Sequence, residues 1–316
     1  MDKFQGIIDE LNDFILVYCK TNRSTLNNAV EDLIEGGGKR LRPILVLLAG
    51  QFGKSEGDKL LSIAAGVELL HMATLVHDDI IDEAKLRRGQ ITTQERFGKN
   101  VAVFVGDYLL SKSYTLFTEQ LSRHSLIKLN KIVKLVCVGE IDQFEEKYDV
   151  DLTIYDYLRR IRRKTALLFA VSTYIGAYES GLRGKSLYYL YNFALEMGMT
   201  FQIQDDLLDF AGQEKKTGKR LDQDMAAGIY TLPVICLLEK KKYNNQLRKI
   251  LNKNKITIDE IAVVTSMVYE SSAFDESIEL GQKFLDKAIN NLNKLPDIEA
   301  RAEMKYILDW QLKRQV

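Results

Sequence analysis

The sequence is poor in the residues that interrupt helices and in those that mark secreted proteins. It contains three prolines in 316 residues, and proline is the strongest helix breaker. It also contains three cysteines, an odd number without CxxC spacing, which argues against both a disulfide framework and a zinc site. We therefore expect long helices and a reducing compartment, the cytoplasm.

Net charge and a membrane-spanning run are also lacking. The 44 lysines and arginines balance 44 aspartates and glutamates, so no global field directs the chain towards nucleic acid or an anionic membrane. The sequence contains no run of eighteen apolar residues, so no bilayer-spanning helix is predicted. The N-terminus, MDKFQGIIDELND, carries acids where a signal peptide carries bases. Any charge chemistry must therefore be local.

Apolar positions recur with a period of about 3.6 residues, whereas strand-like alternation is nearly absent. Stretches such as ALEMGMTFQI are apolar on more than one face, as is typical of helices inside a bundle. We predict an all-α fold of central helices surrounded by amphipathic ones, in a single domain over residues 1–316. The expected helices run at about 3–20, 24–35, 42–52, 57–83, 93–98, 101–121, 124–147, 153–179, 184–212, 223–240, 244–252, 256–270, 273–293 and 297–314.

Two acidic motifs of the form DDxxD each follow an apolar helical run. The first contains Asp78 and Asp82, and the second contains Asp205 and Asp209. Residues four apart share one face of a helix, so each motif presents two carboxylates one turn apart. A single motif could be a solvated helix end, but two are rare by chance. Oxygen ligands without histidine or cysteine suit Mg²⁺, which predicts a magnesium-bridged phosphate or diphosphate.

Basic residues accompany these motifs. Arginine binds phosphate oxygens bidentately and lysine supplies a point charge. Each basic residue taken singly is more often a solvated surface group, and the run Arg159, Arg160, Arg162 and Arg163 is assigned to a helix surface. The retained candidates lie in the glycine-rich turn EGGGKRLRP, after the first acidic motif, and before the apolar stretch ALLFAVSTYIGA; they are Lys39, Arg42, Arg87, Arg88 and Lys164, the last followed by Thr165.

Taken together and in order, several motifs resemble those of the trans-isoprenyl diphosphate synthases, the polyprenyl synthetase family. They are GGKRLRP, ELLHMATLVHDDIIDEAKLRRG, VGDYLL, GEIDQFE, RRKTALLFA, FQIQDDLLDF, TGK and TLPVI, and they cover nearly the whole chain. Around HMATLVHDDIID and YLRRIRRKTALL the sequence is most similar to the catalytic, component II subunits of heptaprenyl diphosphate synthases.

The resemblance implies a helical bundle around a deep apolar cavity and a Mg²⁺-dependent prenyltransferase. Its substrates would be isopentenyl diphosphate and an allylic diphosphate such as farnesyl diphosphate. It also implies a homodimer, or a heterodimer with a small regulatory component, and transient membrane contact for product release.

The resemblance also implies a role for each motif residue. Mg²⁺ would be held against the allylic diphosphate by Asp78, Asp82 and Asp205, with support through water from Asp209. That diphosphate would also be bound by Arg87, Lys164 and Lys219. Isopentenyl diphosphate would be bound by Lys39, Arg42, His71 and Arg88. The breaking carbon–oxygen bond would lie beside Thr165 and Gln202.

Two histidines and one departure from the family pattern need separate treatment. A lone helical histidine is more often a packed core residue, and we interpret His77 in this way. His71 lies two turns before Asp78, at the motif position, which favours a binding role. Many relatives carry lysine where this chain has Ile229. The expected lid over residues 212–224 therefore has one cation fewer, which bears on the part played by Lys219.

Product length is expected to depend on the residues one or two turns before Asp78, because one helical turn rises about 5.4 Å, close to one isoprene unit. Short-chain synthases carry bulky aromatics there, whereas this chain has Ala73 and Thr74. We therefore expect a hexaprenyl to octaprenyl product, with heptaprenyl favoured. The small residues could instead allow close helix packing. Phe104 and Tyr108 are candidates for the end of the tunnel.

Three other classes of protein share some of these sequence features. A class I terpene cyclase would also use aspartates and Mg²⁺, but it needs neither a second DDxxD nor the GGKRLRP site. A di-iron bundle requires two ExxH pairs, and Glu68 with His71 forms the single one. A non-catalytic regulatory subunit would be expected to lack the aspartates. The alternative that the chain is a catalytic subunit active only with a second component stays open.

Overall fold

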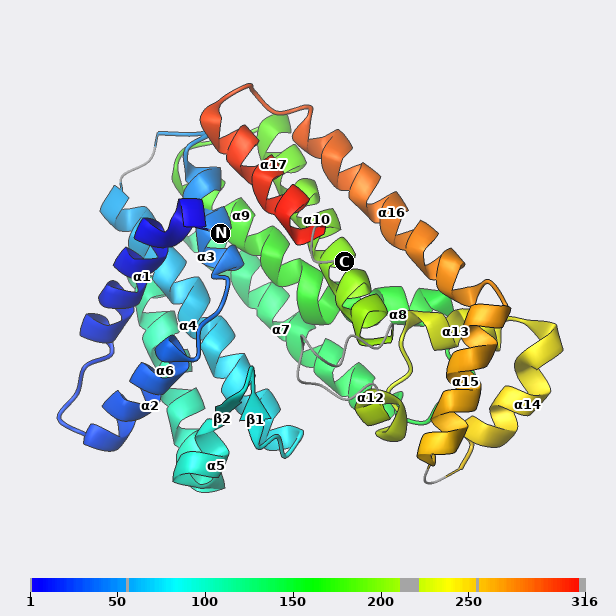
Figure 1. Cartoon of the computed structure of the whole chain (residues 1–316). Coiled ribbons are helices and arrows are strands. Elements are labelled where there is room, and N and C mark those ends of the chain that lie inside the picture. Colours follow the sequence, from blue (N-terminus) through cyan, green and yellow to red (C-terminus); the bar gives the residue numbers. More distant parts are fainter. Residues whose placement is uncertain (1, 55–56, 211–221, 254–255, 313–316) are drawn as a thin grey trace. The chain divides into compact units, whose positions relative to one another are not determined.

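The computed structural model describes residues 2–54, 57–210, 222–253 and 256–312. Nearly all of these residues lie in helices (Figure 1), which confirms the predicted all-α class. The chain divides into two compact units: unit 1 comprises residues 1–129, 171–190 and 295–310, and unit 2 comprises residues 130–170, 191–294 and 311–316. The single-domain organisation stays a prediction.

Unit 1 contains the N-terminal 129 residues of the chain and two later segments. It begins with the 3₁₀ turn η1 (Asp2–Phe4), α1 (Gln5–Tyr18), α2 (Ser24–Glu35) and α3 (Leu41–Gly50). It continues with α4 (Gly57–Ile81), the strands β1 (Leu86–Arg87) and β2 (Gln90–Ile91), α5 (Thr93–Phe97) and α6 (Lys99–Gln120). Parts of α7 (Arg123–Glu145), α9 (Leu167–Glu179), α10 (Lys185–Phe210) and α17 (Glu299–Leu312) complete it.

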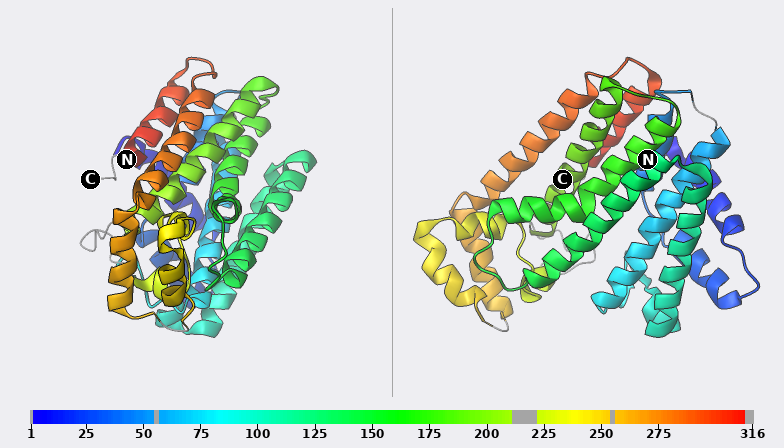
Figure 2. Two further views of the ribbon diagram at one scale, coloured as in Figure 1. Left: turned by 90° about the vertical axis from the view of Figure 1, so that its right-hand side faces the viewer. Right: turned by 180° about the vertical axis from the view of Figure 1, so that it is seen from behind.

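The core helix of unit 1 is α4, which packs against α6, α3 and α1. It lies alongside α6 in Figures 1 and 2. Two glycines permit this close approach: a Cβ atom added at Gly66 would lie 2.7 Å from the Phe117 ring, and one at Gly106 would lie 2.3 Å from Nε2 of His77. By length and composition α4 is the one helix of the described ranges that could cross a membrane. However, 67% of its apolar stretch is buried within the protein, as is typical of a core helix.

Unit 2 holds the remainder of α7, α9 and α10 together with further helices. These are α8 (Ile154–Ile161), the π-helical turn η2 (Arg162–Ala166), α12 (Asp222–Ala226), α13 (Leu232–Leu238), α14 (Lys241–Leu251), α15 (Ile258–Glu270) and α16 (Ala273–Leu292). All seven residues of α13 are buried. It contacts α16, α14, α15 and α8, so α13 is the core element of this part of unit 2.

The structure corrects three details of the sequence prediction. The expected helix 223–240 is two helices, because Gly228 adopts a left-handed φ of 75° and its Cα faces the Tyr148 ring. The expected helix 153–179 contains the π turn η2. The antiparallel pair Leu86↔Ile91 and Arg87↔Gln90 was not predicted, since two residues per strand are too few for an alternating pattern to be visible.

Candidate functional site

The first acidic motif lies at the end of α4 in unit 1. Asp79 is buried, Asp78 is half-buried and Asp82 is exposed. Nε of Arg87, from β1, donates a 2.7 Å hydrogen bond to Oδ1 of Asp79. Burial raises the pKa of Asp79, and the charge and hydrogen bond of Arg87 oppose that rise. The second aspartate is therefore bound within the protein, while the first and last lie on the more accessible side.

The second acidic motif, on α10 in unit 2, has the same organisation. The Tyr157 hydroxyl donates to Oδ2 of Asp206 at 2.7 Å, and Nε2 of Gln202 donates to Oδ1 at 2.9 Å. Burial raises the pKa of Asp206 to about 7, against the opposing effect of these two hydrogen bonds. Asp205 and Asp209 are half-buried. Again the middle aspartate is held internally and the outer two are more accessible.

The outer aspartates of each motif provide only carboxylate oxygen donors. Within the described ranges, no three histidine, cysteine, aspartate or glutamate side chains form a complete metal site. Mg²⁺ does not require one, because it usually keeps several waters and binds through one or two carboxylates together with substrate phosphates. The donor chemistry of Asp78 with Asp82, and of Asp205 with Asp209, therefore fits magnesium.

A cluster of guanidinium groups lies around His71 in unit 1. Nη1 of Arg42 lies 3.1 Å from Nε2 of His71. Arginine can only donate, so Nε2 accepts and the ring proton is on Nδ1. Burial, followed by the charges of Arg42, Arg88, Arg40 and Arg87, holds the pKa of His71 well below its usual value. His71 is therefore neutral at pH 7, in a field that favours an anion.

The glycine-rich turn and the β1–β2 hairpin meet beside this cluster. Nη1 of Arg88 donates to the carbonyl oxygen of Gly37 at 2.6 Å. A Cβ atom added at Gly38 would lie 2.8 Å from Nη1 of Arg88 and 3.2 Å from Nη1 of Arg40. Glycine at position 38 therefore leaves room for two guanidiniums, and the hairpin orders the turn that carries Lys39.

The neighbouring side chains of Lys39 and Arg40 contact different residues, Trp310 and Glu68 respectively. Arg40 adopts a left-handed φ of 46°, and its Nη1 lies 2.6 Å from Oε1 of Glu68 on α4, with both side chains only 4% exposed. The Lys39 ammonium lies 4.7 Å from the centroid of the Trp310 ring. Burial lowers the pKa of Arg42 to about 10, and the Glu68 charge opposes this effect. Glu68 is therefore a buried counter-charge for the cation cluster.

Lys164 and Thr165 lie on the π turn η2 in unit 2. The ammonium of Lys164 lies 2.7 Å from Oε2 of Glu140, and the Thr165 hydroxyl donates to Oε1 of Gln202 at 2.8 Å. Cβ atoms added at Gly139 or Gly198 would clash with the backbone or Cβ of residues 163–166, so these glycines let α7 and α10 approach the turn. Single π turns are frequent at functional sites.

One assignment in the basic run is wrong. Arg160 is not on a helix surface: it is buried, with Nη1 2.8 Å from Oε2 of Glu146 and Nη2 donating to the carbonyl oxygen of Tyr230 at 2.7 Å. Arg163 pairs with Asp142 on α7. These contacts give both arginines structural roles that the sequence pattern did not indicate.

Lys219 lies outside the described residues, as does most of the segment proposed as a lid. Asp224 is described, and its charge contributes to the raised pKa of Asp206, so a further carboxylate lies near the second motif. Ile229 is half-buried, and its backbone N–H donates to the Asp224 carbonyl oxygen at 2.8 Å. Asp224, in GKRLDQD, could have been suspected from its position after the glycine-bearing segment.

The two candidates for product length lie on different faces of α4. Gly66, Ala73 and His77 share the helical face that packs against α6, and His77 also lies 3.4 Å from Asp107 on α6. Ala73 is fully buried. Thr74 instead shares the face of His71 and Asp78 and is half-buried. Helical geometry thus favours close packing for Ala73 and leaves Thr74 beside the binding residues.

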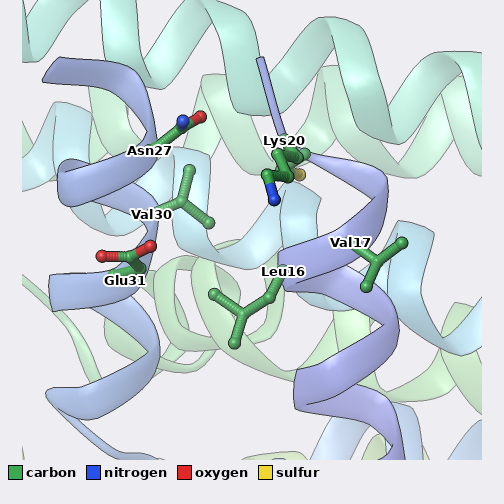
Figure 3. Close-up of a pocket in the computed structure, with 7 residues that line it drawn as sticks. Leu16, Val17, Lys20, Asn27, Val30 and Glu31 are labelled. Atoms are coloured by element: carbon green, nitrogen blue, oxygen red, sulfur yellow. The ribbon is translucent and has the colours of Figure 1, made fainter. Parts of the chain in front are cut away.

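The candidates for the tunnel end differ from each other in exposure. Phe104 on α6 is 67% exposed, whereas the Tyr108 hydroxyl donates to the carbonyl oxygen of Cys19 at 2.8 Å. A pocket of about 200 Å³ lies between α1 and α2 (Figure 3). None of the predicted site residues lines it; its walls are Leu16, Val17, Cys19, Lys20, Asn27, Val30 and Glu31.

An all-α protein with two acidic helix faces and an arginine cluster around a neutral histidine has the side chains expected of an enzyme that binds a polyanionic substrate. Comparison with known proteins is more specific. The sequence matches the polyprenyl synthetase family over residues 23–268. The chain belongs to this family and is a trans-prenyltransferase.

Three relatives illustrate the range of the match. Heptaprenyl diphosphate synthase component 2 of Bacillus subtilis (strain 168) is 37% identical over 99% of this chain and 91% of its own length. The crystal structure of heptaprenyl diphosphate synthase from Staphylococcus aureus is 32% identical, with a TM-score of 0.93 over 99% of both chains. Geranylgeranyl diphosphate synthase of Sulfolobus acidocaldarius is 30% identical over 99% of this chain and 98% of its own length.

Proposed function

We propose that this protein condenses isopentenyl diphosphate with farnesyl diphosphate or a similar allylic diphosphate to form all-trans heptaprenyl diphosphate. The observation that carries this proposal is the cluster of Arg40, Arg42, Arg87 and Arg88 around the neutral His71. Such a field is suited to a diphosphate. Two heptaprenyl-named relatives support the product, whereas the relative named for geranylgeranyl diphosphate favours a shorter one.

The two diphosphates would be bound by basic residues at the family's motif positions, together with His71. Arg87, Lys164 and Lys219 would bind the allylic diphosphate. Lys39, Arg42 and Arg88 would bind isopentenyl diphosphate, and neutral His71 would donate from Nδ1 to one of its oxygens. Mg²⁺, when bound at the outer aspartates, would neutralise charge on the departing diphosphate.

The chemical steps would be ionisation, condensation and elimination. Thr165 and Gln202 would present oxygen dipoles to the developing allylic cation. The double bond of isopentenyl diphosphate would attack that cation, and a proton would then leave to the released diphosphate. The apolar walls of the binding cavity would exclude water, which would otherwise trap the cation.

We also propose that the chain works in the cytoplasm as a homodimer or with a small second component, and that it contacts a membrane transiently when it releases product. The component 2 name of the Bacillus subtilis relative supports a second component. The alternative function is that of a class I terpene cyclase. The GGKRLRP segment and His71 argue for a second, homoallylic substrate and against the cyclase.

The test is incubation of the purified chain with farnesyl diphosphate, isopentenyl diphosphate and Mg²⁺, with and without a candidate second component. Mass spectrometry of the dephosphorylated products would give their length. A product of seven isoprene units that requires isopentenyl diphosphate supports the proposal. A product formed from farnesyl diphosphate alone would establish a cyclase, and a shorter polyprenyl product would overturn the heptaprenyl assignment.

A further inference from the structure

We propose that Tyr157 is a positioning residue that orients Gln202 and Thr165 through Asp206. The inference rests on the proposed roles of Gln202 and Thr165 beside the reacting carbon. Tyr157 opens the stretch YLRRIRRKTALL but was not among the predicted site residues; it lies seven residues before Lys164, on the preceding helix α8. It would not touch substrate itself.

The evidence is a continuous chain of side-chain hydrogen bonds within unit 2. The Tyr157 hydroxyl donates to Oδ2 of Asp206 at 2.7 Å, and Nε2 of Gln202 donates to Oδ1 of the same carboxyl group at 2.9 Å. The Thr165 hydroxyl then donates to Oε1 of Gln202 at 2.8 Å. Four side chains from α8, η2 and α10 are thereby connected.

The chain of bonds has a defined direction. The tyrosine hydroxyl and the Gln202 amide group both use Asp206 as their acceptor, so Asp206 must present an oxygen to each of them. Gln202 must therefore turn its NH₂ group to Asp206, which leaves its oxygen facing Thr165. If Asp206 rotates, the amide loses the partner that selects this orientation. Tyr157 limits that rotation because it holds the second carboxyl oxygen.

Burial makes this restraint effective. Tyr157 is 0% exposed, so its hydroxyl has no access to bulk solvent. The guanidinium of Arg160 lies 5.7 Å from the centroid of the Tyr157 ring and is itself bound to Glu146 and to the Tyr230 carbonyl oxygen. The ring is therefore packed within α8 and its surroundings, and the hydroxyl points to Asp206 from a rigid support.

The experiment compares Tyr157→Phe with Tyr230→Phe. Tyr230 is also 0% exposed, and its hydroxyl donates a single hydrogen bond to the Leu251 carbonyl oxygen at 3.0 Å. Both variants remove one hydroxyl from a buried ring of unit 2, and similar losses of Tm are expected. We expect kcat to fall about tenfold in Tyr157→Phe, with KM for both diphosphates within about twofold of the parent. In Tyr230→Phe, kcat should stay within about twofold.

A coupling test separates positioning from general destabilisation. In a Gln202→Ala background, Tyr157→Phe should cause no further loss of kcat, because the group it orients is gone. Equal effects of Tyr157→Phe and Tyr230→Phe on kcat would overturn the proposal. So would a tenfold loss that persists in the Gln202→Ala background.

A readout without activity keeps this inference separate from the proposed function. In ¹⁵N-labelled protein, the side-chain amide resonances of Gln202 should shift in Tyr157→Phe and stay in place in Tyr230→Phe. An inactive parent protein would contradict the proposed function while leaving this measurement intact. Unchanged Gln202 resonances in Tyr157→Phe would show that Tyr157 does not orient the amide, whatever the activity.

Discussion

Nε of Arg87 donates a 2.7 Å hydrogen bond to Oδ1 of Asp79, and so connects the β1–β2 hairpin to the end of α4. Asp206 occupies the equivalent position in the second motif and is bound by Tyr157 and Gln202. The second aspartate of each DDxxD thus has internal partners from its own unit. Because the second aspartate is bound internally and the outer two are more accessible, substitutions of neighbouring aspartates should differ in their effects on stability and activity.

Asp78→Asn and Asp79→Asn should separate activity from stability. Asp78→Asn removes a proposed Mg²⁺ ligand, and we expect kcat to fall by about 10²–10³ with little change in unfolding free energy. Asp79→Asn weakens the bond to Arg87, whose partial exposure limits the loss of stability to about 1 kcal/mol. Initial rates and urea denaturation would check both. An Asp79→Asn protein as inactive as Asp78→Asn but of unchanged stability would contradict the assignment.

Glu68→Gln should weaken the binding of isopentenyl diphosphate selectively. The carboxylate is buried against Arg40 beside the arginine cluster, and its loss leaves Arg40 without a counter-charge, at a cost of about 3 kcal/mol in stability. Because Arg40 lies between Lys39 and Arg42, its displacement should raise KM for isopentenyl diphosphate about tenfold. KM for the allylic substrate should stay within about twofold in steady-state assays.

Glu179→Gln is the matched control for Glu68→Gln. Glu179 pairs with Lys59 at 3.1 Å and accepts hydrogen bonds from Ser122 and Ser125, towards the other end of α4. Its substitution should lower stability without separating the two KM values. If Glu68→Gln raised both KM values equally, as general loosening would, Glu68 would have no specific part in the isopentenyl diphosphate site.

The fold class could be predicted from the sequence, and so could the two pairs of outer carboxylates, because both depend on local patterns; their role as site residues stays a prediction. Helical periodicity and scarce proline indicated the bundle, and DDxxD spacing indicated carboxylate pairs. The DDxxD pattern could not distinguish Asp79 from Asp78 or Asp206 from Asp205. The internal partner of Asp79 is Arg87 and that of Asp206 is Tyr157, and both contacts form only in the folded protein. Tyr157 opens the stretch YLRRIRRKTALL, but nothing in that stretch indicates its contact with Asp206, which depends on tertiary packing.

The left-handed residues and the π turn were beyond pattern reasoning for a related reason. Arg40 adopts a positive φ, and its side chain is bound by Glu68, 28 residues later in the chain. Gly228 interrupts an apolar run that otherwise reads as one helix. At Arg40 the observed conformation goes against the local preference of a non-glycine residue, whereas at Gly228 the glycine itself permits it.

His71 should make stability depend on pH in a defined direction. Its folded-state pKa lies well below the ordinary value of 6.5, so the unfolded chain binds the proton first and unfolding free energy falls as pH drops below about 6.5. Replacement by glutamine, which still offers Arg42 an acceptor, should remove this contribution of up to about 1.4 kcal/mol per pH unit.

The measurement is the difference in unfolding free energy between parent and His71→Gln at pH 7.5, 6.5 and 5.5, without Mg²⁺. Only the difference isolates His71, because Asp206 has the opposite sign. Its pKa of about 7 in the folded protein means that protonation favours the fold as pH falls. A difference that does not change with pH would contradict a buried, neutral His71.

Gly228→Ala and Gly181→Ala should separate backbone strain from steric clash. Both glycines have left-handed φ values, 75° and 85°. A Cβ atom at Gly228 would lie 2.6 Å from the Tyr148 ring, whereas one at Gly181 would meet nothing within 4 Å. We expect a loss of about 1 kcal/mol for Gly181→Ala and about 3 kcal/mol for Gly228→Ala by urea denaturation. Equal losses would show that Tyr148 moves aside freely.

Thr74→Phe and Ala73→Phe should have different effects on product length and stability. Thr74 shares the α4 face of His71 and Asp78, so a phenylalanine ring there should obstruct the growing chain within about two helical turns and shorten the product to geranylgeranyl or farnesylgeranyl diphosphate. Ala73 lies on the face that packs against α6, where the added ring should cost about 1–3 kcal/mol through overpacking. Product mass spectra and Tm values of both variants would check this. A stable Ala73→Phe protein with shortened product, together with an unaltered product from Thr74→Phe, would show that the tunnel follows the α6 side of α4 instead.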